Sequence, residues 1–197
     1  MDEELAEEID FIYESLIKSG FYNKQDIFEI LEDEFIEEDI EFDKINFKEV
    51  DLSDFNNKNF SSLNNAFLKL ANEGIIAIHN CGYDIEEGVA DAFELFIHLR
   101  NNKMEAQGFC FYTYDDIEEA IFEGSLNITF GDFEEDENKA LEIGKIISHI
   151  LEGENFNIEW DGTINTQIKI NPFKWDKTYD DEEYGMEGAF EVFRNNY

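Results

Sequence analysis

The chain has 197 residues, of which 49 are acidic and 14 are basic, and its formal net charge at pH 7 is -35. Because this charge repels nucleic-acid phosphates and no basic patch offsets it, we exclude a conventional nucleic-acid-binding function. Hydrophobic residues still make up 43% of the chain. We therefore expect a folded protein and not a disordered acidic one.

The sequence predicts a cytoplasmic protein without a membrane partner. No apolar run reaches the length of about 18 residues needed for a membrane span, and the N-terminus is acidic where a secretory signal is basic. The chain has two cysteines, Cys81 and Cys110. A disulfide between them would be unusual in a reducing compartment.

The first 54 residues are the most acidic, with 20 acidic and 4 basic residues. Their acids alternate with apolar residues at helical spacing, which predicts amphipathic helices over residues 3–18 and 23–35. Gly20 is placed to end the first helix, and Asn23 is placed to cap the second. Residues 37–59 show a weak pattern and are interpreted as an irregular connection.

From residue 60 onward, helical and strand patterns alternate. Helices are predicted at 61–72, 84–99, 115–122 and 135–151, and strands at 75–78, 109–112, 126–130, 156–160 and 166–170. The pair Asp161-Gly162 predicts a hairpin turn between the last two strands. The fold class is therefore α/β (or α+β), with a single sheet of about five strands covered by helices, a terminal β-hairpin and an N-terminal helical segment.

The same patterns predict three parts of the chain. Residues 1–59 form an acidic N-terminal helical segment, residues 60–175 form the α/β core, and residues 176–197 form an acidic C-terminal extension with a short docking element.

Several separated segments resemble a bacterial domain family of unknown function. They are Gly74 to Tyr83 (GIxAxHNxGY), Cys110 to Asp116 (CFYxxxD), Leu126 to Gly131, and Trp160 to Thr163 (WDGT). The segments occur in the family's order over roughly residues 10–175. The resemblance implies the extent of the fold and gives no activity.

The first candidate site follows the strand predicted at 75–78 and contains His79, Asn80, Cys81 and Tyr83. Loops at the carboxyl ends of strands often bind ligands in α/β sheets. A thiol just before a helix has a lowered pKa, and His79 is near enough in sequence to act as its base. In the alternative interpretation, His79 and Asn80 bond the turn and Cys81 is a small buried residue.

In a largely parallel sheet, Tyr112, Asp115 and Asp116 reach the same edge from the second strand, and Asp132 reaches it from the third. Paired carboxylates can bind a divalent metal or share acid–base work. The alternative is that Asp115 and Asp116 stabilise the start of a helix.

No metal or cofactor site is predicted. Zinc bound through His79, Cys81 and Cys110 would lack a fourth ligand and a familiar spacing. A ligand-binding role for Asp161 is secondary to its role in a turn. The sequence contains no glycine-rich phosphate loop or nucleophile elbow.

Three functional hypotheses follow. The main one is a non-enzymatic acidic interaction protein, of the inhibitor or immunity type, that binds a basic protein partner. The second is a hydrolase or transferase with a cleft around His79, Cys81 and Asp115. In the third, the acidic surface only provides solubility or adaptation to salt.

Overall fold

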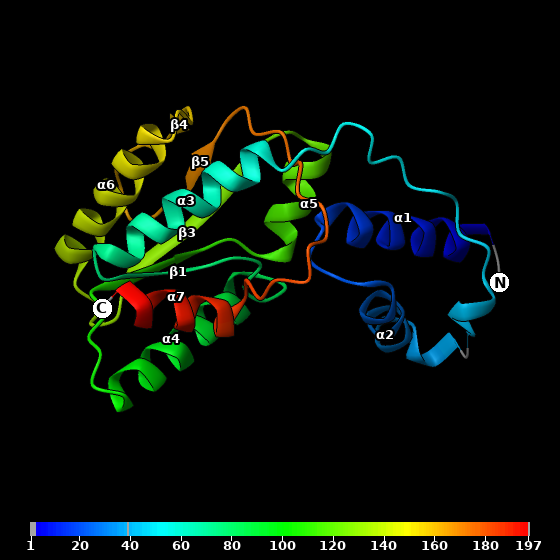
Figure 1. Cartoon of the computed structure of the whole chain (residues 1–197), viewed down its shortest axis with the longest axis horizontal. Coiled ribbons are helices and arrows are strands. Elements are labelled where there is room, and N and C mark those ends of the chain that lie inside the picture. Colours follow the sequence, from blue (N-terminus) through cyan, green and yellow to red (C-terminus); the bar gives the residue numbers. More distant parts are fainter. Residues whose placement is uncertain (1–2, 39, 197) are drawn as a thin grey trace. The chain divides into compact units, whose positions relative to one another are not determined.

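The computed structural model describes residues 3–38 and 40–196 (Figure 1). The chain divides into two compact units. The first unit contains residues 1–58 and 176–181, and the second contains residues 59–175 and 182–197. The segment predicted as a C-terminal extension therefore contributes to both units.

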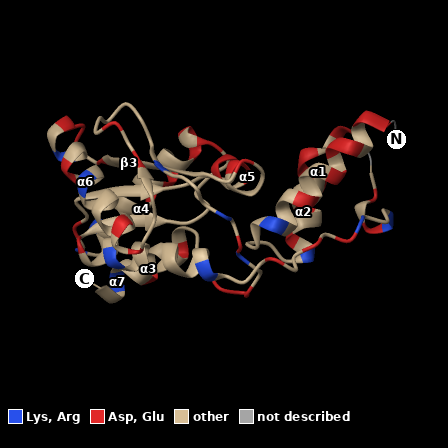
Figure 2. Cartoon of the chain, turned by 90° about the horizontal axis from the view of Figure 1, so that it is seen from above, with Lys and Arg blue, Asp and Glu red and all other residues tan. Residues whose placement is uncertain are grey.

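The first unit is built on two acidic amphipathic helices, α1 (Glu3–Ser19) and α2 (Lys24–Glu34), followed by two short 3-10 turns, η1 (Ile36–Glu38) and η2 (Phe42–Lys44). Red acidic segments mark α1 and α2 in Figure 2. The apolar stripes of both helices are buried, with Leu16 and Leu31 at 2% and 0% exposure. The predicted cap of the second helix is confirmed, because the Asn23 side chain accepts the amide of Asp26 in a capping box.

Residues 176–181 contact the rest of the first unit through a hydrogen bond at Asn57 and a cation–π contact at Phe21. The Asn57 side-chain oxygen accepts the amide of Thr178 at 2.7 Å. The Lys177 ammonium lies 4.9 Å from the ring centroid of Phe21 and 3.2 Å from a carboxylate oxygen of Asp180. Burial lowers the pKa of Lys177, and the Asp180 carboxylate opposes that change.

The second unit is an α/β fold with one mixed sheet. Its helices are α3 (Lys58–Asn72, whose first residue is in the other unit), α4 (Ile85–Asn101), α5 (Tyr114–Phe122), α6 (Glu137–Gly153) and α7 (Met186–Asn196). Its strands are β1 (Ile75–Ile78), β2 (Gly108–Phe111), β3 (Leu126–Asp132), β4 (Ile158–Glu159) and β5 (Ile168–Ile170).

The strand order is β1-β2-β3-β5-β4. Only β1 and β2 are parallel, whereas β3 is antiparallel to both β2 and β5, and β4 is antiparallel to β5. This confirms the predicted fold class and the terminal hairpin. Asp132, however, pairs with Gly108 at the start of β2. It therefore lies beside the amino end of β2, whereas a parallel β3 would have placed it beside the carboxyl end. The prediction that Asp132 reaches the candidate edge is wrong.

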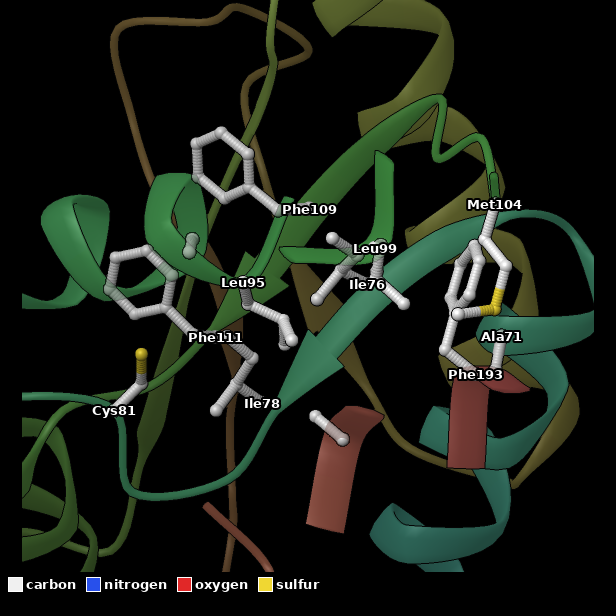
Figure 3. Close-up of a cluster of buried hydrophobic side chains, with 12 residues drawn as sticks. Ala71, Ile76, Ile78, Cys81, Leu95, Leu99, Met104, Phe109, Phe111 and Phe193 are labelled. Atoms are coloured by element: carbon white, nitrogen blue, oxygen red, sulfur yellow. The ribbon is translucent and has the colours of Figure 1, made fainter. Parts of the chain in front are cut away.

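Strand alternation gives the β1–β2 half of the sheet two buried faces. On one face, Ile76 and Phe109 share a core with the buried side chains of α4 and α7 (Figure 3). On the other face, Gly108 and Phe130 lie against Ile143 and Gly144 of α6, so close that a Cβ at either glycine would clash. Helices therefore cover both sides of this half.

The same face that carries Ile76 and Phe109 becomes polar over β3 and β5, where α5 lies against it. Glu119 of α5 accepts hydrogen bonds from Lys169 at 2.8 Å and Asn127 at 2.7 Å. The Lys169 ammonium therefore lowers the pKa of the Glu119 carboxyl. α5 is thus held by a polar network and not by an apolar core alone.

Candidate functional site

The two loops at the carboxyl ends of β1 and β2 lie side by side and continue the parallel pairing of the strands. The amide of Cys81 donates to the carbonyl of Tyr112 at 2.9 Å. The amides of Tyr114 and Asp115 then donate to carbonyls of the first loop at 3.1 and 3.2 Å. The backbone therefore brings residues 79–84 and 112–116 together, as expected for adjacent parallel strands.

The buried part of this site is a group of hydrogen-bonded polar side chains. His79 is 4% exposed, and its Nδ1 lies 2.7 Å from the Tyr112 hydroxyl. Its Nε2 lies 3.1 Å from Oδ1 of Asn64. All three groups are satisfied when Nε2–H donates to Asn64 and the Tyr112 hydroxyl donates to Nδ1. Burial raises the pKa of Tyr112 well above its usual value, so this hydroxyl keeps its proton.

Aromatic rings hold the imidazole of His79 in place. The Phe67 ring stacks on it with centroids 4.3 Å apart, and Tyr184 approaches it edge-on at 5.6 Å. The ring is therefore fixed both by hydrogen bonds and by packing.

Cys81 lies apart from His79, on the α4 side of the sheet. Its thiol contacts the carbonyl of Gly88 at 3.5 Å and a carboxylate oxygen of Asp91 at 3.9 Å. Figure 3 places it in the apolar cluster beside Phe111. Burial, together with the Asp91 carboxylate, raises the pKa of the thiol far above its usual value. This environment disfavours the thiolate that nucleophilic chemistry requires.

The exposed part of the site is aromatic and acidic. The side chain of Tyr83 is 56% exposed, and its ring stacks on Tyr114 with centroids 5.6 Å apart. Asp115 is exposed beside them, and its pKa is raised by partial desolvation and by the charge of Asp84. Tyr114 itself is buried and supports the exposed ring of Tyr83. We call Tyr83, Asp84 and Asp115 the loop surface.

No basic residue of the neighbouring sequence neutralises the loop surface. Residues 70–99 and 104–138, which contain both loops and the helices that follow them, have no Lys or Arg. A cation placed on the loop surface would therefore relieve the repulsion between Asp84 and Asp115.

Asp116 has a different position from Asp115. Its carboxylate accepts the amide and hydroxyl of Thr113 at 2.9 Å each, in the capping box that begins α5. Gln167 reaches its other oxygen at 3.4 Å. Burial raises the pKa of Asp116, although the Thr113 bonds act in the opposite direction. These contacts are those of a helix cap, which is one of the two roles that the sequence suggested for Asp116.

The two remaining predicted ligand-binding residues lie in turns. Asn80 has a φ of 50° and turns the chain between His79 and Cys81. Asp161 accepts hydrogen bonds from Thr163 and Thr166 within its own exposed loop, and these bonds lower its pKa. Both residues therefore have a structural role in a turn.

Sequence analysis missed Asn64 and Tyr184, which contact His79. Asn64 carried a detectable signal, because it is a polar residue on the apolar face of a helix, four residues after Phe60 and three before Phe67. Tyr184 carried none, because its position beside His79 depends on the return of the chain to the second unit.

Within residues 3–38 and 40–196, no three His, Cys, Asp or Glu side chains are arranged to hold a metal ion. In the same part of the chain, no helix combines the length and apolar character needed to cross a bilayer.

A second acidic surface lies on the first unit. A groove of about 450 Å³ is lined by Glu7, Asp10, Glu14, Glu49 and Asp51 together with Phe11, Tyr13, Lys48 and Val50. Phe11 is 47% exposed, and Tyr13 stacks on Phe47 with centroids 3.8 Å apart.

Fold and site together define an α/β protein with a mixed five-stranded sheet and an acidic, aromatic loop surface. The chain matches the model of a family described as a domain of unknown function, DUF6891, over residues 2–179. It therefore belongs to this family. No curated protein and no solved structure is significantly similar to it.

Proposed function

We propose that this protein is a non-enzymatic acidic interaction protein that binds the cationic surface of a basic protein partner, as inhibitor or immunity-type proteins do. The observation that carries the proposal is the loop surface, where the exposed ring of Tyr83 lies beside the carboxylates of Asp84 and Asp115. This combination matches the chemistry of an arginine or lysine side chain.

Two interactions would contribute to recognition. A guanidinium group stacked on the face of Tyr83 gains cation–π attraction. The same group can donate to the carboxylates of Asp84 and Asp115, in charge-assisted hydrogen bonds. The net charge of -35 would mainly accelerate encounter with a basic partner, while the aromatic residue would provide affinity.

The enzymatic hypothesis receives less support from the geometry. It requires His79, Cys81 and Asp115 to converge, but His79 contacts α3 whereas Cys81 contacts α4. Asp115 is exposed, whereas both of these residues are buried. The proposed interaction function needs only the loop surface.

A fluorescently labelled nona-arginine peptide tests the proposal by anisotropy at low and high salt. We expect Tyr83→Ala to weaken binding about tenfold, as loss of an aromatic hot spot does. Asp84→Asn keeps an N-cap side chain for α4 and should weaken binding through the loss of charge alone. The matched control is Tyr179→Ala, which removes another exposed tyrosine (43% exposed) and should leave the affinity within about twofold.

Equal losses in Tyr83→Ala and Tyr179→Ala would contradict the proposal and favour a diffuse acidic coat that serves only solubility. A larger loss in Phe11→Ala than in Tyr83→Ala would place the interaction on the groove of the first unit and overturn the assignment to the loop surface.

A further inference from the structure

A pocket of about 310 Å³ lies in the second unit, between α3, β1 and α7. Its lining combines aromatic and apolar side chains with two acids, namely Phe67, His79, Tyr184, Val192, Glu182 and Glu183. The volume is at the small end of the range for ligand pockets, enough for a molecule of one ring and a short chain.

The inner part of the pocket suits a planar apolar group. Phe67, His79 and Tyr184 all line it, and they form a packed aromatic cluster in which Phe67 stacks on His79 and Tyr184 stands edge-on to the same imidazole. Ala77 and Val192 add aliphatic surface. An aromatic ring of a ligand would extend this cluster through edge contacts, of the kind that aromatic groups prefer.

The chain segment 182–184 provides acidic groups at the pocket. Glu182 and Glu183 are exposed residues that line it, and Gly188 of α7 lies so near that a Cβ there would come within 2.1 Å of the Glu183 carbonyl oxygen. This close packing fixes the segment against α7. The backbone that carries both acids is therefore held at the pocket, and a positively charged end of a ligand would meet their carboxylates there.

We propose that this pocket binds a small arylalkylamine, with its ring against Phe67, His79 and Tyr184 and its ammonium group beside Glu182 and Glu183. The pocket and the loop surface are lined by different residues. The inference is therefore independent of the proposed binding of a basic protein.

Three probes of similar size and different charge test the inference: 2-phenylethylamine, 2-phenylethanol and 3-phenylpropionate. Binding is followed on the full chain by the imidazole resonances of His79 and, as an internal reference, His149 of α6. We expect the amine to shift the His79 resonance saturably, with a dissociation constant of about 1 mM or tighter, while His149 is unchanged. The carboxylate should bind at least about tenfold more weakly than the amine.

Two variants locate the site. Glu182→Gln combined with Glu183→Gln should weaken amine binding about fivefold and leave binding of the neutral alcohol unchanged. Val192→Phe should fill the pocket and abolish binding of all three probes, while an unchanged unfolding transition would show that the fold is intact.

Equal binding of the amine and the carboxylate would overturn the inference, as would a shift of His149 as large as that of His79. Binding that survives in Val192→Phe would also overturn it, because the amine would then occupy another place. Tyr83→Ala is expected to leave amine binding unchanged, so failure here is distinguishable from failure of the protein-binding proposal.

Discussion

The Tyr112 hydroxyl lies 2.7 Å from Nδ1 of His79, and both side chains are buried. This hydrogen bond joins the segments that follow two parallel strands. Asn64 of α3 completes it from the neighbouring helix at 3.1 Å. The bond therefore couples the sheet edge to α3.

Tyr112→Phe removes the hydroxyl and leaves Nδ1 of His79 buried without its partner. We expect the free energy of unfolding in urea to fall by about 1–3 kcal/mol, the cost of an unsatisfied buried polar group. Tyr179→Phe, which removes a hydroxyl from an exposed tyrosine, should change it by less than about 0.5 kcal/mol. Similar losses in the two variants would show that the His79 bond adds nothing specific to stability.

Gly88→Ala tests how closely α4 packs against the sheet. A Cβ at this position would lie 2.4 Å from Cε2 of Phe111 and 2.7 Å from the carbonyl oxygen of Cys81. Because backbone and a core ring would both have to move, we expect the free energy of unfolding to fall by about 1–3 kcal/mol or more.

The matched control is Gly153→Ala at the end of α6, where nothing lies within 4 Å of the new Cβ. Its stability should be unchanged or higher by up to about 1 kcal/mol, because alanine restricts the unfolded chain more than glycine does. Chemical denaturation measures both variants. A Gly88→Ala protein as stable as Gly153→Ala would refute the close contact.

The raised pKa of Asp116 predicts that the free energy of unfolding falls as pH rises. Because burial raises the pKa of its carboxyl above the usual value of 3.8, the folded chain keeps this proton where the unfolded chain has lost it. This contribution to stability is full below the unfolded pKa and is lost as pH rises through the folded pKa. From about pH 4 to about pH 7, the wild type should therefore lose stability relative to Asp116→Asn.

Asp161→Asn provides a comparison of opposite sign. Hydrogen bonds from Thr166 and Thr163 lower the pKa of Asp161, so its contribution is present above the unfolded pKa and is lost as pH falls through the folded pKa. Urea denaturation at several pH values measures both differences. The same direction of change in the two variants would contradict these assignments.

The two cysteines should be unreactive in the folded protein. Burial raises the pKa of both thiols, and both residues are free and buried. A thiol-disulfide reagent at about pH 8 should label neither Cys81 nor Cys110 in the native chain and both in urea, because only the thiolate reacts. Rapid native labelling of Cys81 would instead restore it as a candidate nucleophile.

Local patterns in the sequence determined most of the secondary structure. Helical spacing placed α1 and α2, the apolar run Ile75–Ile78 has the predicted strand bounds, and Asn23 begins a helix as expected. These features depend on residues within a few positions of one another, which is why they can be recognised without the fold. The sequence also indicated that Tyr83 and Asp115 follow neighbouring strands.

Only the tertiary structure decided which of these residues act together. His79 and Cys81 are two positions apart and would share a face in a regular strand, but Asn80 with a φ of 50° breaks the alternation and sends them to opposite sides of the sheet. The antiparallel direction of β3 likewise removed Asp132 from the candidate edge. Strand direction and a single left-handed residue depend on packing across the whole sheet, and no local pattern of residue types encodes them.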